Sequence, residues 1–181
     1  MLSMTDRLSC TRLLAVLLSF LFLASCGYTI VGGQKGIFQG EVVSVDVPVF
    51  KNQTLEPEMS QPFTEAFTQE LITSGVFDVN HSGASSTLQG SIINVRIVPD
   101  AFDANGLAIE KTIYVTVSVA LSRKDGRSIK NWSFLDAEPY GCQDINLEDP
   151  NKREAVTRIA GRISRRFSAL VLADIDRKAP P

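Results

Sequence analysis

The chain has 181 residues, a formal net charge of −2, three cysteines and one histidine. This length suits one ordinary domain with a sizeable core. The mildly acidic balance argues against a nucleic-acid-binding protein, since such domains usually carry a strongly basic surface, and so few Cys and His residues argue against a zinc site.

The N-terminal segment has the pattern of a bacterial lipoprotein leader. Two arginines precede an apolar run over residues 13–23, which is shorter than the roughly 20 residues of a membrane-spanning helix. The run ends in Leu23-Ala24-Ser25-Cys26, which resembles a lipobox, where a cysteine is lipidated and the chain is cut before it. We expect a signal peptide over residues 1–25 and a lipid anchor on Cys26. An ordinary secretory signal and a folded apolar strand are the alternatives.

The residues after Cys26 indicate the membrane in which the protein is anchored. The inner-membrane retention signal has Asp after the lipidated cysteine, whereas this chain has Gly27, so the resemblance favours the outer membrane. Several glycines follow, and residues 26–40 are expected to form a flexible tether. Beyond Cys26, Cys142 is the one remaining cysteine. It is either a buried small hydrophobic residue or a thiol able to pair with a partner.

The first half of the domain is expected to contain a strand, a helix and a short strand. Valines alternate with other residues up to Pro48, which predicts a strand that ends there or lies at a sheet edge. Residues 50–54 are expected to form a turn or loop. The helix is expected over residues 61–73, with Ser60 as N-cap, Pro62 in the first turn and Gly75 as the stop. Its apolar face is formed by Met59, Phe63, Phe67 and Leu71. The short strand is expected over residues 76–79.

The second half is expected to contain three strands and a long helix. The first strand is placed at residues 87–98, with one face formed by Ile93, Val95 and Ile97, and a polar turn follows at 99–106. The next strand alternates most regularly, from Thr112 to Ser122. Asp125-Gly126 predicts a hairpin turn into a strand over residues 129–135. A loop over 139–150 and a helix over 152–174 complete the domain.

This order of elements predicts an α+β fold. We expect a mixed, mainly antiparallel sheet of about four to five strands, with two helices packed on one face. A single domain is assigned to residues 41–176, and a disordered tail to residues 177–181.

The sequence lacks the marks of an enzyme. His81, the only histidine, lies in a Ser/Gly-rich loop without a nucleophile motif, and neither GxSxG nor SxxK occurs. Pairs of acidic residues lie in predicted loops or at a helix start, where acids are expected for solubility and for the helix dipole. We expect no catalytic residues, no cofactor and no metal.

Four arginines share one side of the last predicted helix: Arg158, Arg162, Arg165 and Arg166. They fall opposite the apolar positions, within an arc of about 100°. A solvated helix face is the common interpretation of such a row. The functional alternative is contact with acidic lipid headgroups or with the wall of a barrel.

Several motifs resemble the LPS-assembly lipoprotein family (LptE). They are Cys26-Gly27-Tyr28, the segment from Val45 to Pro57, Phe63-Thr64-Glu65-Ala66, Ser74-Gly75-Val76-Phe77, Leu88-Gln89-Gly90, and the segment from Asn151 to Ala155. The resemblance implies an outer-membrane lipoprotein that faces the periplasm, plugs the LPS-translocating β-barrel, supports its assembly and binds LPS.

The first half also resembles lipoprotein activators of periplasmic cell-wall synthases. Those proteins have a long tether, whereas here about 17 residues separate Cys26 from the first strand, at most ~60 Å of extended chain. The short tether favours the barrel as partner. Thr112, Tyr114, Thr116 and Ser118 supply a wettable sheet face for a polar lumen.

Binding of LPS phosphates requires Lys and Arg side chains presented together. The candidates are Arg96 and Lys111 on neighbouring strands, with Arg127 and Lys130 near the predicted hairpin turn, where Arg123 and Lys124 also lie. For each of these residues the alternative is a solvated charge at the end of a strand.

Overall fold

The computed structural model describes residues 44–178. The predicted signal peptide, Cys26 and the predicted tether lie outside the described residues, as do residues 179–181. Within the described part, the elements follow the order β1, β2, α3, β3, β4, β5, β6 and α4. The predicted α+β class is confirmed, because two helices accompany one mixed six-stranded sheet.

The sheet combines short parallel strands with long antiparallel ones. The short strands are β1 (Ser44–Asp46), β2 (Lys51–Asn52) and β3 (Asp78–Val79), and the long ones are β4 (Ser86–Phe102), β5 (Ala108–Arg123) and β6 (Ser128–Gly141). The strand order is β3-β1-β4-β5-β6, and β2 also pairs with β4. The pairs β1–β3, β1–β4 and β2–β4 are parallel, whereas β4–β5 and β5–β6 are antiparallel. Residues 51 and 52, predicted as loop, thus form the additional strand β2.

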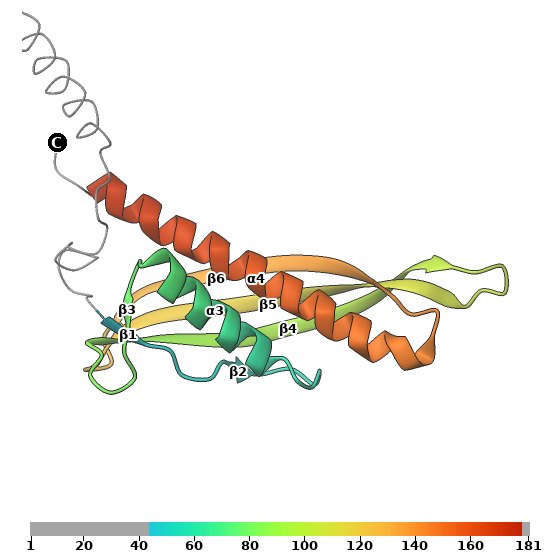
Figure 1. Ribbon diagram of the computed structural model, residues 1–181, viewed down its shortest axis with the longest axis horizontal. Coiled ribbons are helices and arrows are strands. Elements are labelled where there is room, and N and C mark those ends of the chain that lie inside the picture. Colours follow the sequence, from blue (N-terminus) through green and yellow to red (C-terminus); the bar gives the residue numbers. More distant parts are fainter. Residues whose placement is uncertain (1–43, 179–181) are drawn as a thin grey trace, which may run out of the picture. The chain divides into compact units, whose positions relative to one another are not determined.

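Both helices, α3 (Ser60–Ser74) and α4 (Ile145–Lys178), lie on the same side of the sheet (Figure 1). The predicted apolar face of α3 is confirmed, since all four of its residues are buried. Gly75 ends α3 in the left-handed conformation, with φ 62°, and its N–H donates to Leu71 O. Ser60 is not the N-cap, because it is already helical and Met59 precedes the helix without a side-chain cap.

Aromatic rings join the helices to the sheet in the core. Phe67 of α3 lies 4.8 Å from Phe50 and 5.5 Å from Phe167 of α4, measured between ring centroids. Phe167 in turn meets Trp132 of β6 edge-on at 5.0 Å. Such offset and edge-on contacts are favourable for aromatic rings. The core therefore draws on segments that are far apart in the sequence.

The predicted face of β4 is wrong at Ile93, because the strand contains a β-bulge. Register shifts between Ile92 and Asn94, where Ile92 pairs with Val117 and Asn94 with Thr116. Ile92 is fully buried, whereas Ile93 is 44% exposed. The extra residue reverses the alternation, so that Val95 returns to the core side.

The predicted ends of two strands are also wrong, in both cases at a proline. The strand β4 continues past Pro99 to Phe102, and β6 continues past Pro139 to Gly141. Pro99 is accommodated because its missing N–H would point away from β5, on a part of β4 that pairs with no other described strand, and Pro139 because β6 is an outer strand. The predicted turn at 99–106 is thus only the turn at 103–107, and the Asp125-Gly126 turn is confirmed, with Gly126 at φ 85°.

The last helix is longer than predicted at both ends. It begins at Ile145 rather than near residue 152, and it includes Pro150. Asp144 Oδ1 accepts the N–H of Asn146 at 2.9 Å, which stabilises the helix start. The helix extends to Lys178, and so includes the first two residues of the predicted tail.

Candidate interaction site

The face of the sheet opposite the helices is the main candidate surface. On β5, Ile113, Val115, Val117, Val119 and Leu121 point toward the helices and are fully buried. The residues between them point to the other side, together with their cross-strand neighbours on β4 and β6. We call this side the open face; it includes Gln89, Ser91, Asn94, Arg96, Tyr114, Thr116, Ser118, Asn131 and Ser133. Within residues 44–178, neither helix covers it (Figure 1).

Arg96 is the one LPS-binding candidate whose side chain lies on the open face. Its guanidinium carbon lies 4.3 Å from the ring centroid of Tyr114, the residue paired with it on β5. This is a cation–π contact, which orients the guanidinium without neutralising its charge. Nearby, the Thr112 hydroxyl donates a hydrogen bond to Asp100.

Lys111 and Lys130 lie on the helix side of the sheet and are paired with acids of α4. Lys111 Nζ lies 2.5 Å from Glu148 Oε1, and this hydrogen bond is the main reason why the pKa of Lys111 is raised. Lys130 pairs with Asp174, and its Nζ lies 5.3 Å from the centroid of the Trp132 ring. Both lysines therefore join the helix to the sheet.

The structure does not bring the four candidates together. On β6, Lys130 lies opposite Leu121 of β5. Leu121 is ten residues along β5 from Lys111, which corresponds to about 34 Å. Arg127 is exposed in the β5–β6 turn, where its N–H donates to Asp125 Oδ1 at 2.9 Å. Arg96 lies on the opposite face of the sheet from both lysines. A single phosphate group cannot contact all four.

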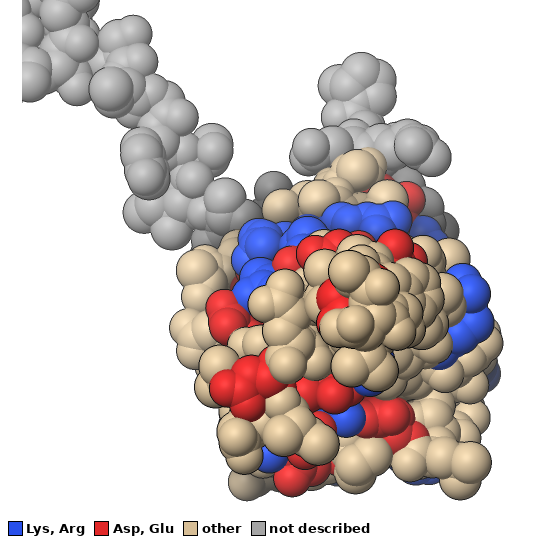
Figure 2. Space-filling view, turned by 90° about the vertical axis from the view of Figure 1, so that its right-hand side faces the viewer, with Lys and Arg blue, Asp and Glu red and all other residues tan. Residues whose placement is uncertain are grey.

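Three of the four arginines in the row on α4 contact β6: Arg158, Arg162 and Arg166. Arg162 Nε lies 2.9 Å from Asp136 Oδ2, and Arg162 Nη1 lies 2.6 Å from Glu138 Oε2. Arg158 Nε also reaches Glu138, at 2.6 Å. Hydrogen bonding to Asp136 is the main cause of the raised pKa of Arg162. In Figure 2, basic side chains lie directly beside acidic ones in the upper part of the surface shown.

Sequence reasoning missed the acidic partners of this row. Asp136 and Glu138 lie two residues apart and so share one face of a strand, while Arg158 and Arg162 lie four apart and share one face of a helix. This complementary spacing is a signal in the sequence. However, the segment that holds Glu138 was expected to lead into a loop, which hid it.

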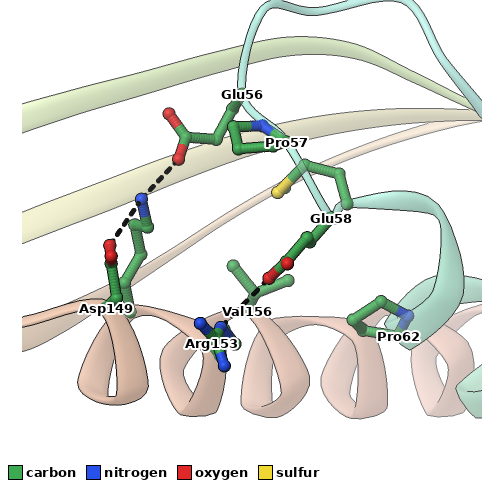
Figure 3. A pocket seen from close by; sticks show the side chains of 9 residues that line it. Glu56, Pro57, Glu58, Pro62, Asp149, Arg153 and Val156 are labelled. Carbon is green, nitrogen blue, oxygen red and sulfur yellow. Dashed lines mark hydrogen bonds and ion pairs between the residues drawn. The ribbon is translucent and has the colours of Figure 1, made fainter.

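A second set of ion pairs surrounds a small cavity of about 130 Å³ between α4 and the loop that precedes α3 (Figure 3). Lys152 Nζ lies 2.6 Å from Glu56 and 3.4 Å from Asp149, and Arg153 pairs with Glu58 at 3.0 Å. Burial disfavours the charged form of Lys152, but the bonds to the two acids outweigh it, so its pKa is raised. These contacts fasten the loop to the helix.

The remaining candidate groups show no catalytic arrangement in the described part. His81 Nδ1 lies 2.9 Å from Asp46 Oδ1, and the thiol of half-buried Cys142 donates to Ala108 O at 3.2 Å. Among residues 44–178, no group of three or more His, Cys, Asp and Glu side chains is placed to hold a metal ion. No helix in this range is both long and apolar enough to cross a membrane.

Comparison with known proteins gives one family match. The model of the LptE family, described as "Lipopolysaccharide-assembly", matches residues 42–169. No curated protein matches this chain.

Among solved structures, a putative lipoprotein from Caulobacter crescentus CB15 is similar in fold. It has a TM-score of 0.51 and 14% sequence identity, over 71% of this chain and 92% of that one. The rare lipoprotein B from Shewanella oneidensis has a TM-score of 0.48 and 11% identity, over 75% of this chain and 99% of that one.

Proposed function

Because this chain belongs to the Lipopolysaccharide-assembly (LptE) family, we propose that it is an outer-membrane lipoprotein that plugs the LPS-translocating β-barrel. It supports the assembly of that barrel and binds LPS during delivery to the cell surface. It acts as a binding partner and not as an enzyme. Its anchor is Cys26, which lies outside the described residues.

The polar open face is the observation that carries this proposal. The lumen of a large outer-membrane barrel is polar, so a domain inside it needs a surface that remains favourable next to water and polar side chains. The open face supplies Ser, Thr, Asn, Gln and Tyr side chains across three adjacent strands. The alternating apolar residues of β5, from Ile113 to Leu121, are already buried under α3 and α4.

Recovery of the partner from native membranes tests the proposal. The tagged full chain should co-purify with a large outer-membrane β-barrel protein. Ser118→Arg, on the open face, should reduce this recovery at least several-fold, because a bulky charge replaces a small hydroxyl. Thr157→Arg, exposed on α4, is the matched control and should leave recovery unchanged. Recovery of a cell-wall synthase in place of the barrel would overturn the proposal in favour of the alternative activator class.

The anchor is tested by fractionation. Cys26→Ala removes the thiol that carries the lipid, so the variant should move from the membrane to the soluble periplasmic fraction. Membrane partition equal to that of the unsubstituted chain would contradict the assignment of Cys26.

For LPS binding, we propose that Arg96 and Arg127 contribute most among the four candidates. Both carry charges that are not in an ion pair with any described acid, whereas Lys111 and Lys130 would first have to leave Glu148 and Asp174. Arg96→Gln with Arg127→Gln should weaken binding of the purified protein to LPS micelles more than Lys111→Gln with Lys130→Gln does. The reverse ranking would refute this assignment.

A further inference from the structure

The strand β6 forms an outer edge of the sheet over 14 residues. Cys142 N–H donates to Ile109 O at 3.0 Å, and the pairing of β5 with β6 keeps one register from this end up to Lys130. Even-numbered residues of β6 therefore direct their N–H and C=O groups to β5, and odd-numbered residues direct theirs outward. An outer strand of this length is a template onto which another strand can add.

From Leu135 to Pro139, this outward row is blocked by groups of the same molecule. Arg166 Nη1 donates to Leu135 O at 3.4 Å, and Arg162 Nη2 donates to Ala137 O at 2.9 Å. Ala137 N–H donates to Asp136 Oδ1 at 2.8 Å. Pro139 has no N–H to offer. Two carbonyls and one N–H that an added strand would use here are therefore occupied, and a second N–H is absent.

The two arginines are held in place by further contacts. Arg162 also binds Asp136 and Glu138, and the guanidinium carbon of Arg166 lies 5.8 Å from the centroid of the Phe134 ring. A planar guanidinium with several donors can bind a carboxylate and a carbonyl at the same time, whereas a lysine has a single nitrogen. The blockage is therefore a property of arginine at these positions.

The neighbouring sequence explains why this edge needs protection. Residues 129–135 include Ile129, Trp132, Phe134 and Leu135, which favour strands and association between strands. Leu135 is 60% exposed at the end of this stretch. Two copies of the chain could pair through β6 if the adjoining edge were open.

We propose that Arg162 and Arg166 guard the outer edge of β6 and prevent two copies of this chain from joining their sheets through it. The guard acts on self-association in solution and is independent of the proposed role in LPS assembly. It gives Arg162 and Arg166, two residues of the arginine row, a role beyond that of a solvated helix face.

A charge-balanced variant tests the guard. Asp136→Thr, Glu138→Thr, Arg162→Met and Arg166→Met together remove the blocking side chains and the acid that holds Arg162, and they leave Pro139 and the net charge unchanged. The full chain is purified under reducing conditions in non-ionic detergent, and the mass of its protein part is measured by light scattering over a range of concentrations. We expect the variant to have at least twice the protein mass of the unsubstituted chain at high concentration.

Adding Ala137→Pro should restore the original mass, because a proline there removes an outward donor without breaking a bond to β5. A folded four-residue variant that keeps the mass of the unsubstituted chain would overturn the proposal. Self-association that Ala137→Pro does not reverse would overturn it as well.

A second variant covers the case in which the first does not fold, as judged by circular dichroism. Arg162→Lys with Arg166→Lys retains both charges, but one lysine nitrogen cannot take the place of the three separate nitrogens with which Arg162 reaches Asp136, Glu138 and Ala137 O. This variant should also self-associate, and adding Ala137→Pro should reverse that self-association. An unchanged mass would refute the guard. Arg153→Lys with Arg165→Lys is the matched control on the same helix, because it makes the same exchange and also retains both charges. Neither residue bonds to β6 within the described part, so the mass should stay unchanged.

Discussion

Gly90 is a residue at which a side chain has no room. It lies on the helix side of β4, and a Cβ built there would lie 2.0 Å from the Phe50 ring. Gly90→Ala should lower the free energy of unfolding by about 1–3 kcal/mol, because the ring must move in a packed core. Gly83→Ala is the control, since its Cβ would meet only ordinary contacts. Urea denaturation measures both; equal stability of the two variants would contradict the close packing.

Glu138 links stability to pH. Burial raises its pKa, but hydrogen bonds from Arg162 and Arg158 outweigh burial, so the pKa lies below the usual 4.5. A carboxyl group with a lowered folded-state pKa stabilises the fold above its unfolded pKa, and this contribution is lost as pH falls through the folded value. The stability difference between the unsubstituted chain and Glu138→Gln should therefore be constant near neutral pH and shrink below pH 4.5. Urea unfolding at a series of pH values checks this, and a difference that grows on acidification would refute it.

At the scale of elements, the bulge in β4 decides which isoleucine belongs to the core. Ile92 is fully buried and Ile93 is 44% exposed, although they are adjacent and chemically identical. Ile92→Ala should cost about 2–5 kcal/mol in the free energy of unfolding, as expected for a large buried side chain. Ile93→Ala should cost less than about 1 kcal/mol. Chemical denaturation of both variants gives the comparison, and a larger cost at Ile93 would place the bulge elsewhere.

At the scale of the whole described domain, the sheet has one dry side and one polar side. Val117 and Thr116 of β5 differ by one methyl-for-hydroxyl exchange and lie on opposite faces. Val117→Thr should destabilise by about 1–3 kcal/mol, because it buries a hydroxyl under the helices. Thr116→Val should change stability by no more than about 0.5 kcal/mol. Thermal unfolding separates the two, and similar melting temperatures would mean that the open face is covered.

Local periodicity allowed much of the fold to be predicted. The alternation from Ile113 to Leu121 defined both faces of β5, and the four-residue spacing from Met59 to Leu71 defined the buried side of α3. These patterns suffice because a side chain's direction follows from the backbone repeat alone. The helical repeat also predicted the helix that carries the arginine row. Motifs in the sequence led to the LptE family, which the family model confirms.

Only the tertiary structure decided the rest, because it depends on contacts between residues far apart in the chain. The bulge at Ile93 arises from pairing with β5, and β6 extends past Pro139 because it is an outer strand. The partners of the charged side chains also depend on contacts between residues far apart in the chain. Lys111, Lys130 and Arg162 are each spaced like surface residues in the sequence, yet each is bound to an acid at least 26 residues away. Sequence spacing determined which side of its element each residue occupies, and packing of α4 against the sheet determined its partner.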